Sequence, residues 1–496
     1  NFDLIVIDES HNFRNNTKGK RDEDGNLIRK SRYERLMDDI IQAGVKTKVL
    51  LLSATPVNND LKDLRNQIYF VTEGRDTAFA QSFGILSIKD TLTVAQKTFM
   101  EWAKRSGDKN ARDLMDRLSA GFFTLLDELT IARSRKHIKK HYRASMAQIG
   151  HFPKRKKPAS IFSEIDLKGR FLSYDKLNDE INNYQLSLYS PSRYVLPQFK
   201  MHYDAGNVRN FSQESREKFL VGMMKVNFLK RLESSVHSFA ITMERTVAKI
   251  EDLEARLKAF QQQQDAKATD IQPDFFAEPE EDDDELAEAF QVGTKLKYDM
   301  EHLDVAAWLQ DLARDKQQLA LLADAAQSVN AERDAKLAEL KKLIEHKVRH
   351  PGTNNLGQEN RKVIVFCAFA DTAAYLYEQL EIWARQRLGV HIALVSGGAR
   401  PNRSTFGQAD FAQILTNFAP RAKKRDKMKS MPQDDEIDIL IATDCISEGQ
   451  NLQDCDYLIN YDIHWNPVRI IQRFGRIDRI GSPNTAIQLV NFWPTP

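Results

Sequence analysis

The sequence predicts an α/β protein with two sheet domains joined by large helical insertions. Short apolar runs that end in polar residues occur near both ends of the chain, as strands of parallel sheets do. Between them lie long stretches whose apolar residues follow the alternating three-and-four spacing of helices. At about 150 residues per domain, a chain of 496 residues has room for roughly three domains.

Composition places the chain among globular proteins. Hydrophobic residues make up 42% of it, and no apolar run approaches the roughly 18 residues that a membrane span needs. The net charge is only +2, so any affinity for polyanions must come from local patches. Cys367, Cys445 and Cys455 lack the paired spacing of a metal site, and free buried thiols explain them best. We therefore expect a cytoplasmic protein with no membrane partner.

Two apolar runs near the start carry polar residues at their ends. The first is followed by Asp8 and Glu9, and the second, after a polar loop and a helical pattern, by Ser53 and Thr55. This order predicts strand, crossover helix, strand. A parallel strand that ends in two carboxylates suits a nucleotide-hydrolysing sheet, in which the Asp holds Mg²⁺ and the Glu orients water. Small hydroxyl residues at the same edge can hydrogen-bond between these carboxylates and a neighbouring domain.

A second group of motifs lies near the C-terminus, where two apolar runs flank a charged loop and a helical pattern follows. Gln472, Arg476 and Arg479 are spaced i, i+4, i+7, so a helix presents all three together. Guanidinium groups held side by side suit a phosphate chain, and arginines that reach a γ-phosphate accelerate phosphoryl transfer by about 10³–10⁵. A helix of surface ion pairs has the same spacing, so the spacing alone leaves both interpretations open.

Taken together, these motifs resemble those of the superfamily-two helicase-like ATPases. DESHNFRN and LLSATPVNN are similar to motifs II and III, and VIVFCAF to motif IV. TDCISEGQNLQ is similar to motif V and QRFGRIDRIG to motif VI. The residue patterns SEGxNLQ and WNPxR resemble those of the Swi/Snf group, and within it those of the bacterial HepA-type members associated with RNA polymerase or with phage defence.

The resemblance implies two RecA-like domains, the first incomplete, that hydrolyse ATP with Mg²⁺ between them and move on double-stranded DNA. It implies catalytic roles for Asp8, Glu9, Gln472, Arg476 and Arg479, with Asp8 as the Mg²⁺ ligand. It places His11 and Gly449, together with Asp8 and the two arginines, at the nucleotide. Residues that couple hydrolysis to movement are then Ser53, Thr55, Thr443, Asp444 and Glu448. RNA polymerase or phage-defence proteins are the further partners it suggests, and the oligomeric state is left open.

One departure from the family pattern is the absence of G-x-x-x-x-G-K-[ST]. We expect the chain to be a fragment whose phosphate loop lies upstream of Asn1, inactive by itself, with an uncovered hydrophobic sheet edge in its first domain. The alternative is a nucleic-acid-binding scaffold that does not hydrolyse ATP. The other alternative to a translocase is a helicase that unwinds RNA or DNA, although the residue patterns of motifs V and VI in such helicases differ from those of this sequence.

We predict three segments. Residues 1–165 form the first RecA-like domain with a helical protrusion at about 77–129, and residues 351–496 form the second. Residues 166–350 are a helical insertion, an antiparallel hairpin with one long helix over 219–260, a second over 298–348 and a disordered acidic tip at about 261–297.

Two basic stretches allow two interpretations each. The first covers residues 133–157 and contains Arg133, Arg135, Lys136, Lys139 and Lys140, and the second covers residues 421–429. Contact with nucleic-acid phosphates is one interpretation. A solvated charged surface is the other.

Overall fold

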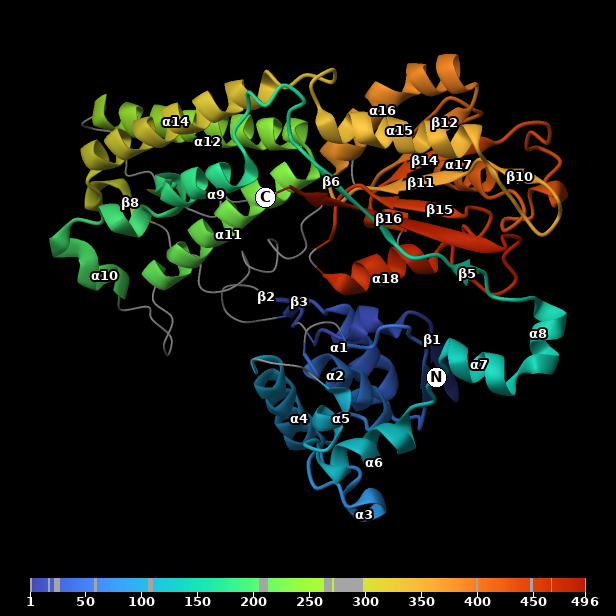
Figure 1. Cartoon of the computed structure of the whole chain (residues 1–496). Helices are drawn as coiled ribbons and strands as arrows, with labels where there is room; N and C mark the ends of the chain where they lie inside the picture. Colours follow the sequence, from blue (N-terminus) through green and yellow to red (C-terminus); the bar gives the residue numbers. More distant parts are fainter. Residues whose placement is uncertain are drawn as a thin grey trace. The chain divides into compact units, whose positions relative to one another are not determined.

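The computed structural model describes residues 2–16, 18–21, 27–57, 60–105, 110–204, 213–262, 270–271, 298–397, 400–446, 449–464 and 466–495. It divides into two compact units, Asn1–Arg143 and Ala144–Pro496. The two units are blue to cyan and cyan to red in Figure 1. Both have the predicted α/β class, whereas the predicted three-segment division stays a prediction.

The sheet of the first unit consists of two parallel strands. β1 (Leu4–Ile7) pairs with β4 (Lys48–Leu51) in a register that joins Leu4 to Lys48. Helix α1 (Arg32–Leu36) and a π-helical turn (Met37–Ile41) connect them, which confirms strand, crossover helix, strand. The polar loop before α1 contains a short antiparallel pair, β2 (Lys20–Arg21) and β3 (Leu27–Arg29).

This small sheet is covered on one face only. Ile5, Ile7 and Val49 pack against a cluster from α1, the π-helical turn and Phe70. The opposite face exposes an apolar strip made of Phe2, Leu4, Val6, Leu50 and Leu52. Parallel sheets in folded proteins are normally covered on both faces, so this strip is an unusually apolar surface.

The other helices of the first unit form a separate cluster. Apolar side chains of α2, α4 and α6 pack together there, and Ser87 begins α4 by accepting a hydrogen bond from the Asp90 amide at 3.0 Å. The helices are α2 (Lys62–Val71), α3 (Ala80–Phe83), α4 (Ile88–Ala103), α5 (Ala111–Met115), α6 (Ala120–Leu129) and α7 (Arg135–His141).

The second unit is built on a larger sheet, eight-stranded within the described residues. Its order is β13-β12-β14-β11-β15-β16, with β5 and β6 both paired to β16. All pairings are parallel except that of β13 with β12. The strands are β5 (Lys154–Arg155), β6 (Ala159–Ser163), β11 (Val363–Phe366), β12 (His391–Val395), β13 (Arg403–Ser404), β14 (Ile437–Ala442), β15 (Tyr457–Asn460) and β16 (Ala486–Pro494).

Helices cover both faces of this sheet. α15 (Ala335–Arg349) and α16 (Ala370–Trp383) pack on one face, and α17 (Phe411–Phe418) packs on the other. Val363 and Val365 of β11 point to the first face, whereas Ile364 and Phe366 point to the second. Continuous apolar strands are what a sheet buried on both sides requires.

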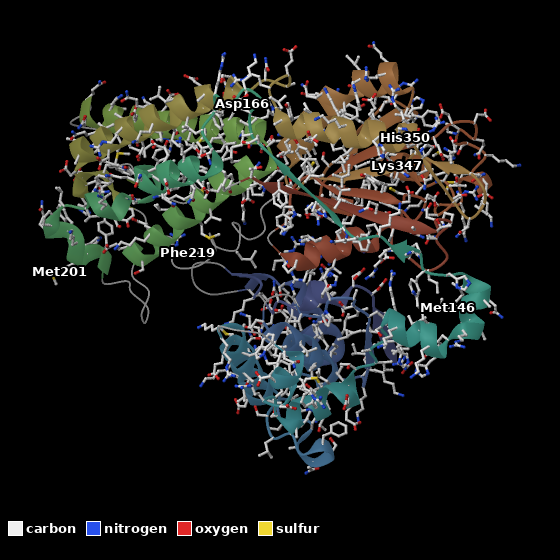
Figure 2. The ribbon with its side chains drawn as sticks, in the orientation of Figure 1. Met146, Asp166, Met201, Phe219, Lys347 and His350 are labelled. Atoms are coloured by element: carbon white, nitrogen blue, oxygen red, sulfur yellow. The ribbon has the colours of Figure 1, made fainter. Side chains whose placement is uncertain are left out.

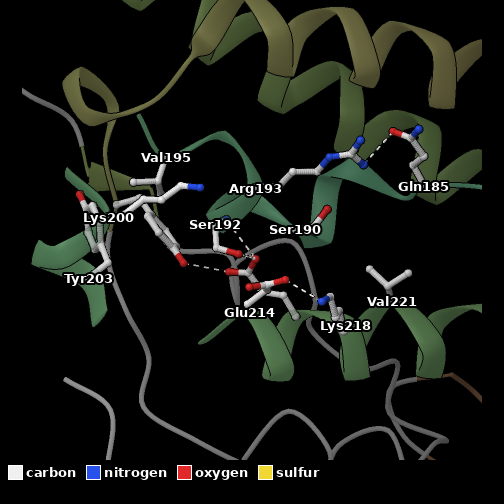
Figure 3. Close-up of a pocket in the computed structure, with 12 residues that line it drawn as sticks. Gln185, Ser190, Ser192, Arg193, Val195, Lys200, Tyr203, Glu214, Lys218 and Val221 are labelled. Carbon is white, nitrogen blue, oxygen red and sulfur yellow. Dashed lines mark hydrogen bonds and ion pairs between the residues drawn. The ribbon is translucent and has the colours of Figure 1, made fainter. Parts of the chain in front are cut away.

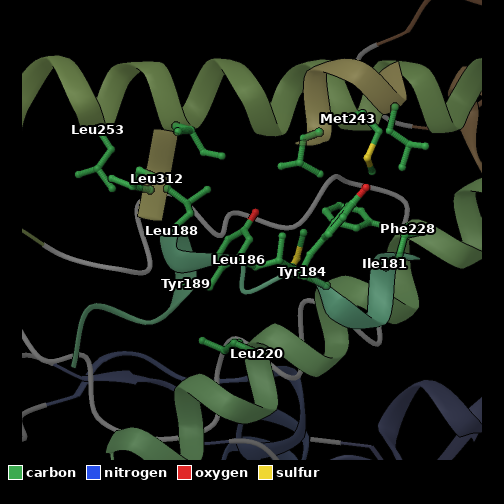
Figure 4. Packing of buried hydrophobic residues seen from close by; sticks show 14 of the residues in the cluster. Ile181, Tyr184, Leu186, Leu188, Tyr189, Leu220, Phe228, Met243, Leu253 and Leu312 are labelled. Atoms are coloured by element: carbon green, nitrogen blue, oxygen red, sulfur yellow. The ribbon is translucent and has the colours of Figure 1, made fainter. Parts of the chain in front are cut away.

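A helical hairpin extends from the sheet and has its own core. α12 (Val236–Gln262) lies antiparallel to α14 (Val305–Gln327), and Figure 4 shows Met243 and Leu253 of α12 with Leu312 of α14 above the segment that carries Leu186 and Leu188. The other helices of this part are α9 (Tyr174–Asn183), α10 (Lys200–Asp204) and α11 (Gln213–Ser234). A short pair, β7 (Asp270–Ile271) and β8 (Tyr298–Asp299), lies between α12 and α14 in the sequence.

The prediction of one long helix over 219–260 is wrong in one respect. The chain leaves the helix at Ser235, whose Oγ accepts a hydrogen bond from the Ser238 amide at 3.0 Å and so begins α12 anew. The apolar seam nevertheless continues across this break, because Leu232, Val236 and Phe239 are all buried in one cluster. Most of the predicted acidic tip lies outside the described residues.

The second predicted helix is also two helices, and they pack in different places. α14 lies in the hairpin core, whereas Leu337, Leu340 and Ile344 of α15 lie in the core of the sheet. Two ion pairs hold this region, and Figure 2 labels one member of each, Lys347 and Asp166. Lys347 of α15 contacts Asp456 beside β15 at 2.8 Å, and Arg333, just before α15, donates to Asp166 with its Nε at 3.0 Å.

No helix among the described residues is both long and apolar enough to cross a lipid bilayer.

We predict that Leu312→Ala destabilises the chain by about 2–5 kcal/mol, because it leaves a cavity in the hairpin core. Leu312 is fully buried, whereas Leu321 of the same helix is 65% exposed. Leu321→Ala is therefore the matched control and should change the free energy of unfolding by less than about 0.5 kcal/mol. Urea unfolding followed by circular dichroism measures both, and equal effects would contradict the hairpin packing.

Candidate functional site

The candidate site of the first unit lies at the carboxyl ends of β1 and β4. Asp8 and Glu9 follow β1 directly, and the Glu9 backbone takes left-handed values, φ 49° and ψ 48°. Two hydrogen bonds hold this uncommon conformation: the Ser10 amide donates to the Leu52 carbonyl at 2.9 Å, and Asn12 Nδ2 donates to the Glu9 carbonyl at 3.1 Å. The strained turn re-aims the chain immediately after the strand, at the position predicted for a water-orienting carboxylate.

His11 connects the two strand ends. Its Nδ1 lies 3.4 Å from Glu9 Oε2 and 3.2 Å from Ser53 Oγ, and the ring is only 3% exposed. Ser53 Oγ in turn accepts a hydrogen bond from the Thr55 amide at 3.2 Å. The structure thus brings Glu9, His11, Ser53 and Thr55 together, as the motif spacing predicts.

Sequence reasoning missed Ser10 and Gln67. The Ser10 hydroxyl is buried and donates to Gln67 Oε1 at 2.9 Å, while Gln67 Nε2 donates to the Pro56 carbonyl at 2.6 Å. Gln67 of α2 therefore links the loop after β1 to the loop after β4. Its only signal in the sequence was a polar residue beside the apolar Leu64 and Ile68 of that helix.

The candidate site of the second unit lies at the carboxyl end of β14. Thr443 follows this strand, donates its amide to the Val395 carbonyl and accepts the Gly397 amide with Oγ1 at 3.2 Å. Asp444 comes next, and Gly449 turns the loop back with φ 70°, which a side chain would strain. Glu448 lies outside the described residues.

Helix α18 (Pro467–Gly475) carries the predicted arginine motif. Asn466 caps it by accepting the Val468 amide at 3.0 Å, and Pro467 occupies the first helical position. The predicted single helix over all three site residues is wrong, because α18 ends at Gly475, Arg476 forms its C-cap and Arg479 lies beyond it.

Arg476 and Arg479 nevertheless meet at one atom. Arg476 Nη1 and Arg479 Nη2 each donate to the Gln450 carbonyl oxygen at 3.2 Å. Their Nε atoms donate to the carbonyls of Gln472 at 3.1 Å and Gly475 at 3.2 Å. These four hydrogen bonds have three acceptors, the backbone carbonyls of Gln450, Gln472 and Gly475, and they orient both guanidinium groups. A turn of the motif V loop, rather than a helix face, gathers the two arginines.

Arg473 is the main residue that sequence reasoning missed here. It is fully buried, and its Nε and Nη2 donate to the two carboxylate oxygens of Asp444 at 2.6 and 2.8 Å. Burial acts to raise the pKa of Asp444, but the Arg473 guanidinium outweighs it and the pKa is lowered. The pair fastens the β14 loop to α18. Its only signal in the sequence was an arginine directly after Gln472, about 100° round the helix axis from it.

A buried polar network extends from this pair to the helical hairpin. Arg473 Nη1 donates to the Asp462 carbonyl at 3.1 Å, and the Asp462 carboxylate accepts the Ser234 hydroxyl at 2.6 Å. Ser234 also contacts Thr372 Oγ1 at 2.7 Å. Next to Thr372, Asp371 accepts hydrogen bonds from three arginines of separate elements, Arg231, Arg245 and Arg400.

The segment before the hairpin also contacts the arginine motif. Arg155 of β5 donates to Asp478 at 2.7 Å. Gly150 and Gly481 approach so closely that a Cβ on Gly481 would lie 2.7 Å from the Ile149 carbonyl oxygen, and both glycines have positive φ. The predicted basic stretch is therefore partly a strand of the second sheet.

The other basic residues lie on or beside α7, which has no buried residue. Arg133, Lys136, Lys139 and Lys140 are exposed and Arg135 is half-buried. Cys367 and Cys455 are buried free thiols, but Cys445 is exposed, contrary to our expectation of three buried thiols. Cys445 lies in the loop after β14, and its side chain does not pack in the core of the sheet.

Asp8 fits the Mg²⁺ role that the motifs imply. It is exposed at the end of β1, and one carboxylate oxygen accepts the Glu9 amide at 2.9 Å. The described residues contain no group of three or more His, Cys, Asp or Glu placed to hold a metal. Mg²⁺ is commonly held by only one or two carboxylates together with substrate phosphates, so this donor set is suitable.

A cavity of about 470 Å³ lies elsewhere, beside α11 in the helical part (Figure 3). Glu217 in its wall accepts hydrogen bonds from Ser192 Oγ at 2.5 Å and Tyr298 Oη at 2.9 Å, and Glu214 pairs with Lys218 at 2.6 Å. None of the predicted site residues lines it. Arg193 in the same wall donates to the neutral Gln185 side chain at 3.0 Å, and the lining indicates no particular ligand.

Comparison with known proteins finds a family match for part of the second unit. Residues 335–481 match the family model described as helicase conserved C-terminal domain. The chain carries a helicase C-terminal domain. This domain contains the Asp444–Arg473 pair and the two arginines on Gln450, and the match confirms the family resemblance of the sequence.

Two bacterial proteins are similar to part of this chain. The chain is 35% identical over 120 residues to an uncharacterized ATP-dependent helicase, YqhH, of Bacillus subtilis, covering 24% of this chain and 17% of that protein. It is 30% identical over 135 residues to the RNA polymerase-associated protein RapA of Yersinia enterocolitica, covering 27% and 12%. The chain thus spans less than a fifth of the length of either relative. The helicase domain of Pyrococcus furiosus Hef aligns with 99% of this chain and 71% of its own at 14% identity, with a TM-score of 0.37.

We predict that Asp444→Asn destabilises the helicase domain by about 3–5 kcal/mol at pH 7, because it leaves the Arg473 charge buried without its partner. The folded-state pKa of Asp444 lies below its unfolded value of about 3.9. Its contribution is therefore present above pH 4 and is lost as the pH falls through the folded pKa.

Urea unfolding of both proteins at several pH values measures this difference. It should stay constant between pH 7 and pH 5 and shrink at lower pH. Asp426→Asn removes an exposed carboxylate of the same domain and should change little. A loss no larger than that of Asp426→Asn would contradict the role of the pair.

Proposed function

We propose that the protein is an ATP hydrolase that uses ATP to move along double-stranded DNA. The observation that carries the proposal is the meeting of Arg476 and Arg479 on the Gln450 carbonyl, within a helicase C-terminal domain. Two permanent positive charges oriented by neutral carbonyls suit a polyphosphate. The carboxylates that follow β1 supply the complementary chemistry.

Each predicted residue then has a role. Glu9 orients the attacking water, and its left-handed backbone and the His11 contact hold it in place. Arg476 and Arg479 stabilise charge on the terminal phosphate, with Gln472 beside them. Asp8 holds Mg²⁺, which when bound supplies charge neutralisation on the phosphates. Gly449 allows the turn that presents the Gln450 carbonyl.

Coupling to movement is assigned to the residues that link loops. Ser53 and Thr55 reach Glu9 through His11, so a change at the nucleotide displaces the loop after β4. Thr443, Asp444 and Glu448 belong to the loop after β14, which the Asp444–Arg473 pair ties to α18. We assign movement on a duplex without strand separation because the motifs resemble those of the Swi/Snf group.

The nucleic-acid partner is proposed to contact the basic residues of α7, because an exposed cationic helix gives sequence-independent affinity for phosphates. RNA polymerase is a proposed protein partner, because the relative RapA is an RNA polymerase-associated protein. Phage-defence proteins are the alternative partner, and a cytoplasmic location fits both.

We predict that Glu9→Gln or Arg479→Ala lowers ATP turnover of the full-length protein by roughly 10³-fold, because each removes a group that acts only in the transition state. The measurement is phosphate release with and without duplex DNA. Glu101→Gln and Arg385→Ala, which change exposed residues of the same two units, are the matched controls and should leave turnover unchanged.

The outcomes separate the rival functions. Turnover of the two variants within a few-fold of the wild type would contradict the assigned roles. No hydrolysis by the wild type would favour a scaffold. Stimulation by duplex DNA with displacement of a third strand, and no separation of the two duplex strands, would support translocation. Separation of tailed RNA or DNA duplexes would favour an unwinding helicase.

We predict that Lys136→Ala with Lys140→Ala weakens DNA binding and reduces the slope of log K against log salt by roughly 2, because about one counterion is retained per lost phosphate contact. Fluorescence anisotropy with a labelled duplex at several salt concentrations measures this slope. Lys97→Ala with Lys89→Ala removes two charges from α4 and should leave it unchanged. Equal slopes in both pairs would contradict DNA contact at α7.

A further inference from the structure

A third cation lies at the residue on which the two arginines meet. Lys423 Nζ donates to Gln450 Oε1 at 2.6 Å, while Arg476 and Arg479 donate to the Gln450 carbonyl oxygen. One glutamine therefore receives hydrogen bonds from three positive side chains. They come from two distant parts of the chain, the loop after α17 and the end of α18.

The loop that carries Lys423 is fixed by its neighbours. The amides of Arg421 and Ala422 donate to the Asp454 carboxylate at 2.7 and 3.0 Å. Arg425 is buried and donates to Asn417 Oδ1 at 3.1 Å. Lys423 is half-buried between these anchors, whereas Lys427 and Lys429 are exposed. The loop thus turns one of its lysines towards Gln450 and the others towards solvent.

The surroundings of Lys423 favour an anion. Within the described part of the chain, its ammonium group donates a hydrogen bond only to the neutral Gln450 amide oxygen, and it forms no ion pair. Burial, followed by the like charge of Arg479, lowers the pKa of Lys423. A partly desolvated ammonium beside a guanidinium loses solvation and gains repulsion, and a phosphate oxyanion would offset both.

We propose that Lys423 is a phosphate-binding residue that holds the terminal phosphate of the nucleotide together with Arg476 and Arg479. The inference rests on the proposed ATP hydrolysis and adds a residue to it. Gln450 is then a positioning residue, because its carbonyl and its side chain orient all three cations before the phosphate arrives. Lys423 binds as a point charge, so substrate and transition state benefit alike.

Lys423→Met in the full-length protein tests this. We expect the KM for Mg-ATP to rise roughly tenfold with kcat changed less than about threefold, which is the loss of one charge-assisted hydrogen bond shared by both states. Lys423→Arg keeps the charge and should recover most of the loss. Lys427→Met removes an exposed lysine of the same loop and should leave KM unchanged.

The outcomes distinguish this inference from the proposed function. If the wild type hydrolyses ATP and Lys423→Met leaves KM unchanged, the inference is wrong and the function stands. If Lys423→Met weakens duplex DNA binding and not KM, the lysine serves nucleic acid and the inference is also wrong. If the wild type does not hydrolyse ATP, the proposed function fails, and calorimetry with tripolyphosphate decides the anion site. Weaker binding by Lys423→Met would then support the site, and equal binding would overturn it.

Discussion

The second unit depends on one buried charge. The Arg473 guanidinium has no exposed surface, and leaving it there without partners would cost several kcal/mol. Its partners are the Asp444 carboxylate, Asn460 Oδ1 and the Asp462 carbonyl, which follow or end β14 and β15, the strands on either side of β11. The last turn of α18 is therefore fastened to the carboxyl edge of the sheet. That attachment is what brings the end of the helix, with Arg476, back to the loop at Gln450.

The same edge of the sheet is where the helical hairpin is attached. Ser234 and Thr372 share a hydrogen bond, and Ser234 reaches Asp462. Lys336 strengthens the junction, because its ammonium donates to the Ser234 carbonyl at 2.9 Å, at the C-terminal end of α11. A buried polar joint of this kind allows few alternative arrangements. Rotation of the hairpin against the sheet would have to break hydrogen bonds one step away from Arg473.

Residue patterns in the sequence predicted the parts of this structure that depend on local order. Apolar runs located β1, β4, β11 and β14, and the three-and-four spacing found Phe239 and Leu253 of the hairpin core. Motif order placed Glu9, His11 and Ser53 together.

The end of α18 was missed because a spacing of i, i+4, i+7 is the same whether or not the helix continues past Gly475. Arg473 and Gln67 were missed because their burial depends on partners from distant segments. The seam of α15 was assigned to the hairpin because periodicity does not say which surface an apolar face meets.

The strand order has a consequence for how the protein is made. β6 lies at the end of the second sheet, next to β16, and the hydrogen bond from Gln488 to Lys157 in this region spans 331 positions. At about 5–20 residues per second, a ribosome needs roughly 20–60 s to cover that distance. During this interval β6 has been synthesised and its neighbour has not. The second sheet can therefore be completed only after β16 has been synthesised, and the nascent polypeptide must keep an apolar strand from aggregating until then.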